Sequence, residues 1–335
     1  MSFLLIVAIV AAYAILSSAW KFYRNYQDAI RSGLPVILCP VNNQSILYII
    51  AQVPLRPILA RFLPEPLFDR VRLSIFGWEF LDKGAIHERV GPAFILVTAG
   101  VNELWCADPH MAQSILSRRK DFVQLPIGSK ILCFLGENIL TAGNGAFGPS
   151  QFLREDEIAG NLFVFTAAGY DTTANTMTYA VGLMAAYPQW QAWLQDELDR
   201  VLGSKAVGES RILPYTTYFP KLKRCLAVMM ETLRLYPALI HISRSISHDQ
   251  AISKEGENYI IPGPCTVYIN NAGLHHARED WGNDAGDFRP SRWLTLNSDG
   301  TEAELITPAR GTFLPWSGGP RMNRPEQFAL RWIPR

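Results

Sequence analysis

The sequence lacks the features that direct a chain to nucleic acid, to a disulfide scaffold or to a zinc site. Its 335 residues carry a net charge of only +1 at pH 7, so no excess of positive charge favours a nucleic-acid partner. Its five cysteines are an odd number with no CxxC pair, which indicates neither a disulfide framework nor a zinc site. This cysteine usage favours a reducing, cytosol-facing compartment. Internal repeats and low-complexity tracts are also absent from the sequence.

An uncharged run near the N-terminus, residues 3–20, is just long enough to cross a bilayer as a helix. Aromatic and basic residues follow in Trp20–Arg24, where an interfacial belt is expected. No basic residue precedes the run, so the positive-inside rule places the rest of the chain in the cytosol. A cleaved signal peptide is the alternative, because Ser17–Ala19 is small enough for processing, but it lacks a basic n-region. We therefore expect an uncleaved anchor over residues 1–20 and a globular domain over residues 21–335.

The remaining sequence, with a globular composition of 49% hydrophobic residues, has clear local patterns. Residues 45–80 are apolar and punctuated by prolines, which indicates either buried core or a surface that enters the membrane interface. Residues 90–125 contain two β-like runs (FILVTA and ELWCA) and a helical segment (HMAQSILSRRKDF). Residues 153–187 are predicted to form one long apolar helix, and residues 187–201 a second.

The long helix carries an unusual polar interruption, AAGYDTT. Burying Asp171 and two hydroxyls on an apolar helix is costly unless partners or waters satisfy them, and Gly169 costs about 1 kcal/mol more than alanine. A locally opened helix whose backbone groups and hydroxyls hold water would explain both, and proton delivery needs that arrangement. The alternative is an ordinary helix whose threonines hydrogen-bond back to carbonyls.

A carboxylate and a guanidinium lie three residues apart in the motif Glu231-Thr-Leu-Arg234, on one face of an apolar helix. Most such pairs are solvated and weak. A buried pair needs a further partner for the remaining donors of the arginine. The segment FRPSRW downstream offers Arg292 for this purpose.

The loop FLPWSGGPRM near the C-terminus completes an ordered set of motifs with AAGYDTT, ETLR and FRPSRW. In this order the set resembles the cytochrome P-450 family. The resemblance implies a mainly α fold with small β-sheets (α+β) behind an N-terminal transmembrane helix. It implies haem b (iron protoporphyrin IX) as the cofactor, held in that family by a cysteine thiolate in the loop.

The resemblance also assigns roles to individual residues. Asp171 and Thr172 take the proton-relay positions. Arg244 and Arg321 match arginines that bind the haem propionates, which suits the fixed fork of the guanidinium. Glu231, Arg234 and Arg292 form a structural lock beneath the haem. Four further positions match the family's cofactor contacts: Ala168, Gly169, Trp316 and Gly319.

A pair of neighbouring histidines, His275 and His276, suggests a separate metal site. Neighbouring histidines on a strand or a turn point apart, however. The pair also resembles a structural segment of the family. We therefore expect no metal site there.

The sequence departs from the family pattern at the decisive ligand. Asn323 occupies the position of the cysteine, so no metal ligand is assigned, and Arg324-Pro325 replaces the usual Pro-Gly. A carboxamide is neutral and cannot supply the electron push of a thiolate. Met322 offers a thioether or simply packs. The other cysteines lie outside this loop.

Further departures concern the length of the domain. Only the short link 142–152 stands where family members have a large helical block, and the chain stops soon after the loop. We therefore expect a partial domain with an internal deletion there and a C-terminal truncation. Two origins remain open: a monooxygenase sequence that has lost coding segments, and a non-catalytic, membrane-tethered relic or interaction protein.

The activity implied by the resemblance is insertion of one oxygen atom of O2 into a small apolar substrate. Electrons would come from an NADPH-dependent reductase. The implied place is the endoplasmic reticulum membrane, single-pass, with the domain in the cytosol and without a nucleic-acid partner. With Asn323 in place of the thiolate, we expect this exact chain to be inactive as a monooxygenase.

Overall fold

The computed structural model describes residues 2–125, 136, 138, 154–203, 214–254, 256–298 and 302–318. Its α-helices are α1 (Ser2–Ile30), α2 (Ile46–Phe62), α3 (Glu65–Val71), α4 (Trp78–Asp82), α5 (Ala85–Val90), α6 (Pro109–Ser117), α8 (Glu155–Ala186), α9 (Pro188–Leu202), α10 (Tyr215–Tyr218), α11 (Lys223–Leu235), α12 (Asn271–His276) and α13 (Arg278–Trp281). Its short 3-10 helices are η1 (Arg72–Ser74), η3 (Phe219–Lys221) and η4 (Pro290–Trp293).

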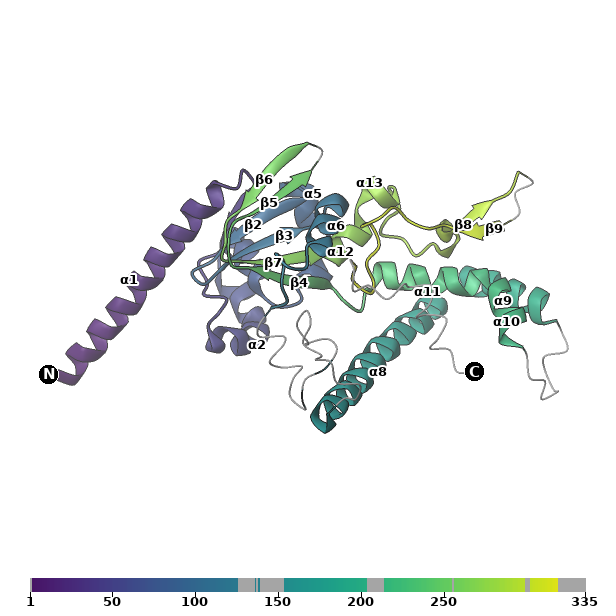
Figure 1. Cartoon of the computed structure of the whole chain (residues 1–335), viewed down its shortest axis with the longest axis horizontal. Coiled ribbons are helices and arrows are strands. Elements are labelled where there is room, and N and C mark those ends of the chain that lie inside the picture. Colours follow the sequence, from purple (N-terminus) through teal and green to yellow (C-terminus); the bar gives the residue numbers. More distant parts are fainter. Residues whose placement is uncertain are drawn as a thin grey trace.

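The described strands are short and form small sheets. They are β1 (Val36–Leu38), β2 (Ala93–Val97), β3 (Asn102–Cys106), β4 (His241–Ile246), β5 (Gln250–Lys254), β6 (Glu257–Ile261), β7 (Cys265–Asn270), β8 (Leu294–Leu296) and β9 (Glu302–Leu305). A mixed sheet of five strands has the order β1-β2-β3-β7-β4, and β5-β6 and β8-β9 form hairpins. The fold is therefore mainly α with small β-sheets, as the sequence predicts (Figure 1).

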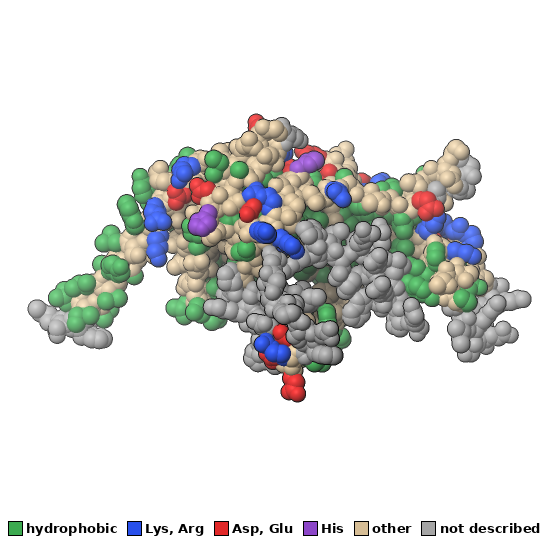
Figure 2. All heavy atoms as spheres, viewed as in Figure 1, with side chains coloured by type: hydrophobic (Ala, Val, Ile, Leu, Met, Phe, Trp, Pro, Cys, Tyr) green, Lys and Arg blue, Asp and Glu red, His purple; other side chains and the backbone are tan. Residues whose placement is uncertain are grey.

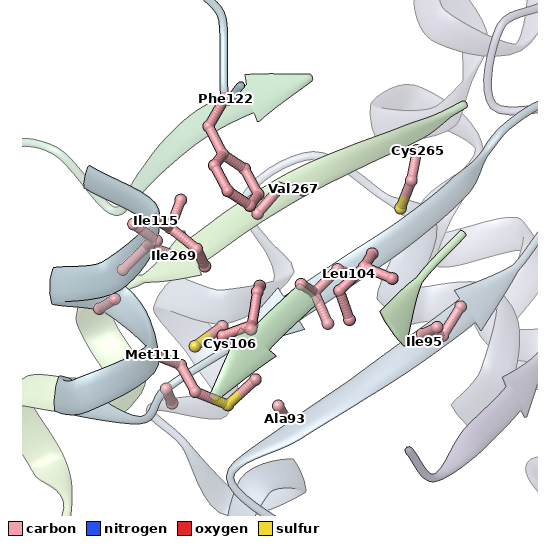
Figure 3. Close-up of a cluster of buried hydrophobic side chains, with 14 of the residues drawn as sticks. Ala93, Ile95, Leu104, Cys106, Met111, Ile115, Phe122, Cys265, Val267 and Ile269 are labelled. Carbon is pink, nitrogen blue, oxygen red and sulfur yellow. The ribbon is translucent and has the colours of Figure 1, made fainter. Parts of the chain in front are cut away.

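The five-stranded sheet is covered on both faces, which explains why β2 is a continuous apolar run buried at every position. On one face, Met111 and Ile115 of α6 pack against strands β3 and β7 together with Phe122 (Figure 3). Helix α6 begins where Asp108 accepts a hydrogen bond from the backbone N–H of Met111 at 2.8 Å, an N-cap followed by a proline in the first turn.

The opposite face of the sheet carries an aromatic cluster. The Trp105 ring stacks on Tyr268 at a centroid distance of 4.4 Å and meets Trp78 edge-on at 4.8 Å. Beside them the buried carboxylate of Glu103 accepts hydrogen bonds from Asn43 at 2.5 Å and from the Trp105 indole at 3.0 Å. The carboxylate of Glu79 hydrogen-bonds the His241 ring across this cluster.

Helix α1 is longer than the apolar run from which it was predicted. It continues to Ile30, and Phe22, Tyr26 and Ala29 pack against the main core. Figure 1 shows its N-terminal part running out from the sheet, and Figure 2 shows that hydrophobic side chains cover that part. By length and composition, the segment Leu5–Ile30 can cross a membrane. The exposed apolar part of α1 and the part that packs against the core therefore form one continuous helix.

The segment 45–80 forms α2 to α4. Part of it is buried core, as one of the two interpretations expects, and part of it is exposed. Leu73 and Trp78 are buried in the aromatic side of the core. Helix α2 instead exposes a row of large apolar side chains, including Leu47 at 81% and Phe62 at 76% exposure. The prolines at 54 and 57 stand inside α2, which remains helical through them.

The second half of the described chain is helical. Helix α8 packs against α11 and α9, and Tyr179 of α8 stacks on Tyr236 at 4.4 Å (Figure 1). Helix α9 begins with Pro188 and ends at Leu202, where Gly203 caps it, a common pairing of start and stop residues. Its indole Trp193 donates to Glu302 at 2.8 Å and so ties α9 to the β8-β9 hairpin.

Candidate functional site

The central feature of the helical half is the fully buried pair Glu231 and Arg234 on α11. The guanidinium donates to both carboxylate oxygens, from Nε to Oε2 at 2.8 Å and from Nη2 to Oε1 at 2.9 Å. Its remaining N–H groups reach backbone carbonyls, including that of His275 at 2.7 Å and that of Ala285 at 2.6 Å. Each of the three guanidinium nitrogens of Arg234 therefore donates to a hydrogen-bond partner.

The carboxylate of Glu231 is equally well satisfied. Arg292 donates from Nε to Oε1 at 2.9 Å, the Trp293 indole donates to Oε2 at 2.9 Å, and the backbone N–H of Arg289 donates to Oε1 at 2.9 Å. Burial acts to raise the pKa of Glu231, but the bonds and charges of Arg234 and Arg292 hold it below its ordinary value. The sequence pattern predicted Arg292 as a partner of the buried pair but did not predict Trp293. The indole N–H of Trp293 and its position next to Arg292 could have indicated this role.

The histidines 275 and 276 connect this cluster to the loop that carries Trp316. They lie on helix α12 and not on a strand or turn, so that part of the prediction was wrong. The Nε2 atom of His275 accepts a hydrogen bond from the backbone N–H of Leu314 at 2.9 Å. Burial lowers the pKa of His275 to about 3 and that of His276 to about 4, so both rings are neutral at pH 7. Within the described ranges, no group of three or more His, Cys, Asp or Glu side chains could hold a metal ion.

The described part of the loop, 311–318, is tightly held. Asn271 donates to the carbonyl of Leu314 at 3.2 Å, and the backbone N–H of Ser317 donates to the same carbonyl at 3.1 Å. Ser317 has a left-handed backbone with a φ of 70°. A side chain at Gly318 would come within 2.9 Å of Leu116, so glycine lets the loop lie against α6. Trp316 itself is half-buried.

Four of the predicted loop residues lie outside the described residues: Gly319, Arg321, Met322 and Asn323. The short link 142–152 and Cys133 also fall there. Their predicted roles remain predictions from the sequence.

Helix α8 departs from the expectation for its polar interruption. It is continuous from Glu155 to Ala186, and the Thr172 hydroxyl donates to the carbonyl of Ala168 at 2.6 Å. This is the ordinary back-bonded helix, so the predicted local opening was wrong for this structure. Asp171 is exposed and not buried, while Gly169 is half-buried. An exposed carboxylate is solvated by water, which removes the cost that suggested an opened helix.

Arg244, the predicted propionate ligand, lies on β4 and is half-buried. Its guanidinium donates to the carbonyl of Ser243 at 2.8 Å. Asn271 binds both the segment before this strand and the loop. Its side chain donates to the backbone carbonyl of Leu239 at 2.9 Å and also to that of Leu314. The structure thus brings β4, α12 and the loop together through a residue that sequence reasoning missed.

The comparison with protein families shows to which family the chain belongs. A family model described as Cytochrome P450, here written cytochrome P-450, matches residues 105–323, which hold α8, the buried cluster and the loop. The chain belongs to the cytochrome P-450 family. Its members named as monooxygenases are oxidoreductases, and haem is the cofactor that the family implies.

Two curated cytochrome P-450 relatives illustrate the similarity. A cytochrome P-450 monooxygenase of the phomenoic acid biosynthesis cluster of Leptosphaeria maculans is 38% identical over 209 residues, covering 57% of this chain and 35% of the relative. A putative cytochrome P-450 of Caenorhabditis elegans is 33% identical over 211 residues, covering 61% of this chain and 36% of the relative. The chain therefore spans about a third of the length of these relatives.

Among solved structures, a zebra fish cytochrome P-450 crystallised with progesterone is similar to part of the chain. The match has 24% identity and a TM-score of 0.41, and it covers 55% of this chain and 37% of the solved one.

The residue at the predicted ligand position does not fit a haem held by a thiolate. That residue is Asn323, which lies outside the described residues, and a carboxamide is not an anionic sulfur donor. Three of the described cysteines, Cys39, Cys106 and Cys265, are buried in the hydrophobic core around the five-stranded sheet. Burial raises the pKa of the Cys39 thiol to about 11 and those of Cys106 and Cys265 to about 12. Burial also raises the pKa of the Cys225 thiol, to about 11.

Proposed function

We propose that this chain is a membrane-tethered member of the cytochrome P-450 family that does not insert oxygen into a substrate. The observation that carries the proposal is the carboxamide of Asn323 in the place of the cysteine. Without a negatively charged sulfur on the iron, the O–O bond lacks the electron push that favours its cleavage. Weaker support comes from Asp171, the proposed relay residue, which is exposed to solvent.

The family activity is the reaction that this chain would carry out if the cysteine ligand were present. That reaction is insertion of one atom of O2 into an apolar organic substrate, with electrons from an NADPH-dependent reductase. Residues 21–335 would form a partial domain that lacks a helical block near 142–152. The proposed cofactor contacts of this partial domain are Arg244, Arg321, Trp316, Gly319, Ala168 and Gly169. Asp171 and Thr172 would occupy the relay positions. The buried set Glu231, Arg234 and Arg292 would be its structural lock.

The proposed place of the chain is the endoplasmic reticulum membrane, crossed once by α1. The apolar exposed part of α1 supports the anchor, and the basic residues that follow Trp20 support a cytosolic body. A second function, that of a tethered interaction protein, is supported by the apolar side chains that α8 exposes, among them Leu162 at 62% and Tyr170 at 72%.

A haem-reconstitution experiment tests the main proposal. The purified full chain, incubated with haem, reduced and treated with carbon monoxide, is expected to show no thiolate-type band. The Asn323→Cys variant is the matched comparison, because it restores the sulfur at one position and changes nothing else. A thiolate-type band from the unmodified chain, or hydroxylation of any substrate by it with a reductase, would show that the ligand assignment is wrong.

A further inference from the structure

A polar hollow of about 230 Å³ lies where α1 leaves its apolar stretch and joins the body. Charged and amide side chains line it from α1 and from the two loops beside β1 and β3: Lys21, Arg24, Asp28, Asn42, Gln44 and Asn102. Figure 2 shows basic side chains on α1 directly after its hydrophobic part. Neither the cytochrome P-450 site nor the buried cluster on α11 includes these residues.

The hollow has a fixed position relative to the apolar helix. The side chain of Asn25 donates to the carbonyls of Thr98 at 2.9 Å and Gly100 at 3.1 Å, and Asn102 donates back to the carbonyl of Asn25 at 2.8 Å. Phe22, on the same stretch of the helix, packs against the core. The 18 residues of the apolar run span about 27 Å at 1.5 Å per residue, close to the hydrocarbon thickness of a bilayer. If α1 spans the membrane, the hollow lies at the depth of the lipid headgroups.

The two sides of the hollow offer complementary chemistry. Lys21 and Arg24 are exposed cations with no ion-pair partner among the described residues. Asn102 is only 4% exposed, and its Oδ1 atom has no hydrogen-bond partner in the described part of the protein. Asp28 adds a carboxylate, which contacts Arg31 at 3.4 Å on the surface. A ligand that fits needs an anionic group for the cations and an N–H donor for the carboxylate of Asp28.

We propose that this hollow binds the headgroup of a phospholipid with a primary ammonium, such as phosphatidylethanolamine. The phosphate contacts Lys21 and Arg24, and the ammonium donates to the carboxylate of Asp28. A quaternary ammonium has no N–H and cannot donate, so phosphatidylcholine fits less well. Free phosphoethanolamine shares the same groups, but the apolar run beside the hollow favours the lipid. The inference rests on the proposed function, because it requires α1 to lie in the membrane.

Native mass spectrometry of the full chain in a non-ionic detergent tests the proposal. Short-chain phosphatidylethanolamine, short-chain phosphatidylcholine and soluble phosphoethanolamine are titrated separately. We expect phosphatidylethanolamine to bind at least about tenfold more tightly than phosphatidylcholine, equivalent to about 1.4 kcal/mol. Lys21→Gln with Arg24→Gln should weaken both lipids, whereas Asp28→Asn should abolish the preference between them.

A matched control removes the same two charges elsewhere. Arg119 and Lys120 are exposed and do not line the hollow, so replacing both with glutamine should leave lipid binding unchanged. Equal affinity for both lipids, or binding unaffected by the Lys21 and Arg24 changes, overturns the proposal. Phosphoethanolamine that binds as tightly as the lipid overturns the lipid as the ligand. Flotation with vesicles distinguishes failure of the membrane anchor from failure of the headgroup site. A chain that does not float refutes the anchor. A chain that floats without a headgroup preference refutes only the site.

Discussion

The side-chain amide of Asn271 donates a hydrogen bond to the carbonyl of Leu314 at 3.2 Å and a second to the carbonyl of Leu239 at 2.9 Å. The residue is fully buried on α12. It therefore joins the approach to β4 with the loop that carries Trp316, two segments that lie far apart in the sequence.

Replacing Asn271 with alanine should lower the free energy of unfolding by about 1–3 kcal/mol, because the buried carbonyl of Leu314 and the partly buried carbonyl of Leu239 lose a partner. Urea unfolding followed by circular dichroism measures the change. Asn283→Ala is the control, because that asparagine is exposed, and it should change stability by less than about 0.5 kcal/mol. Equal effects of the two replacements would contradict the anchoring role.

Removing one charge of the buried pair should be more damaging. Arg234→Met leaves the carboxylate of Glu231 buried with fewer donors, which should cost about 3–5 kcal/mol of stability. The exposed pair of Arg200 and Asp196 serves as the comparison, and Arg200→Met should cost less than about 1 kcal/mol. Thermal unfolding of both variants gives the contrast. A loss for Arg234→Met as small as that for Arg200→Met would exclude a structural lock.

The two buried histidines predict a loss of stability in acid. The folded pKa values of His275 and His276 are lowered by burial to about 3 and about 4, against an ordinary value of 6.5. Below pH 6.5 the unfolded chain therefore binds protons that the folded chain cannot. Stability is complete above pH 6.5 and falls towards pH 4, by at most about 1.4 kcal/mol per pH unit for each histidine. Urea titrations of His275→Gln with His276→Gln should show a shallower pH dependence than the unmodified chain, and an unchanged slope would be evidence against neutral rings.

The carboxyl group of Glu103 should act in the opposite direction. Burial raises its pKa from 4.5 to about 7, although Asn43 and the Trp105 indole lower it in part. The folded chain thus keeps a proton that the unfolded chain releases, and this contribution is lost as the pH rises from 4.5 to 7. Glu103→Gln cannot ionise and should gain stability relative to the unmodified chain over that interval. A difference between the two chains that does not vary with pH would contradict the raised pKa.

Much of the architecture was predictable where one local pattern dominates. The β-like run FILVTA predicted a short strand, and the structure has β2 (Ala93–Val97) there. The long apolar pattern near 153–187 predicted α8 within two residues at its start. These elements follow from hydrophobic periodicity alone.

Contacts between distant segments could not be predicted in the same way. Asn271 and the indole of Trp293 act through partners that only the folded chain brings close. The exposure of Asp171 was missed because an apolar helix was assumed to be covered, and an apolar sequence does not reveal what covers it. The length of α1 was underestimated because Phe22 and Tyr26 continue its helix as core residues after the apolar run has ended.

The unbroken course of α1 has a mechanical consequence. A globular domain on a flexible tether can rotate over a bilayer, but here the apolar run and the residues that pack against the core lie on one continuous helix from Ser2 to Ile30. Membrane helices tilt by about 20° on average and respond to bilayer thickness by changing that tilt. If α1 spans a membrane as we propose, any change in its tilt should therefore tilt the sheet region with it, and lipid composition would then affect which side of the protein faces the membrane surface.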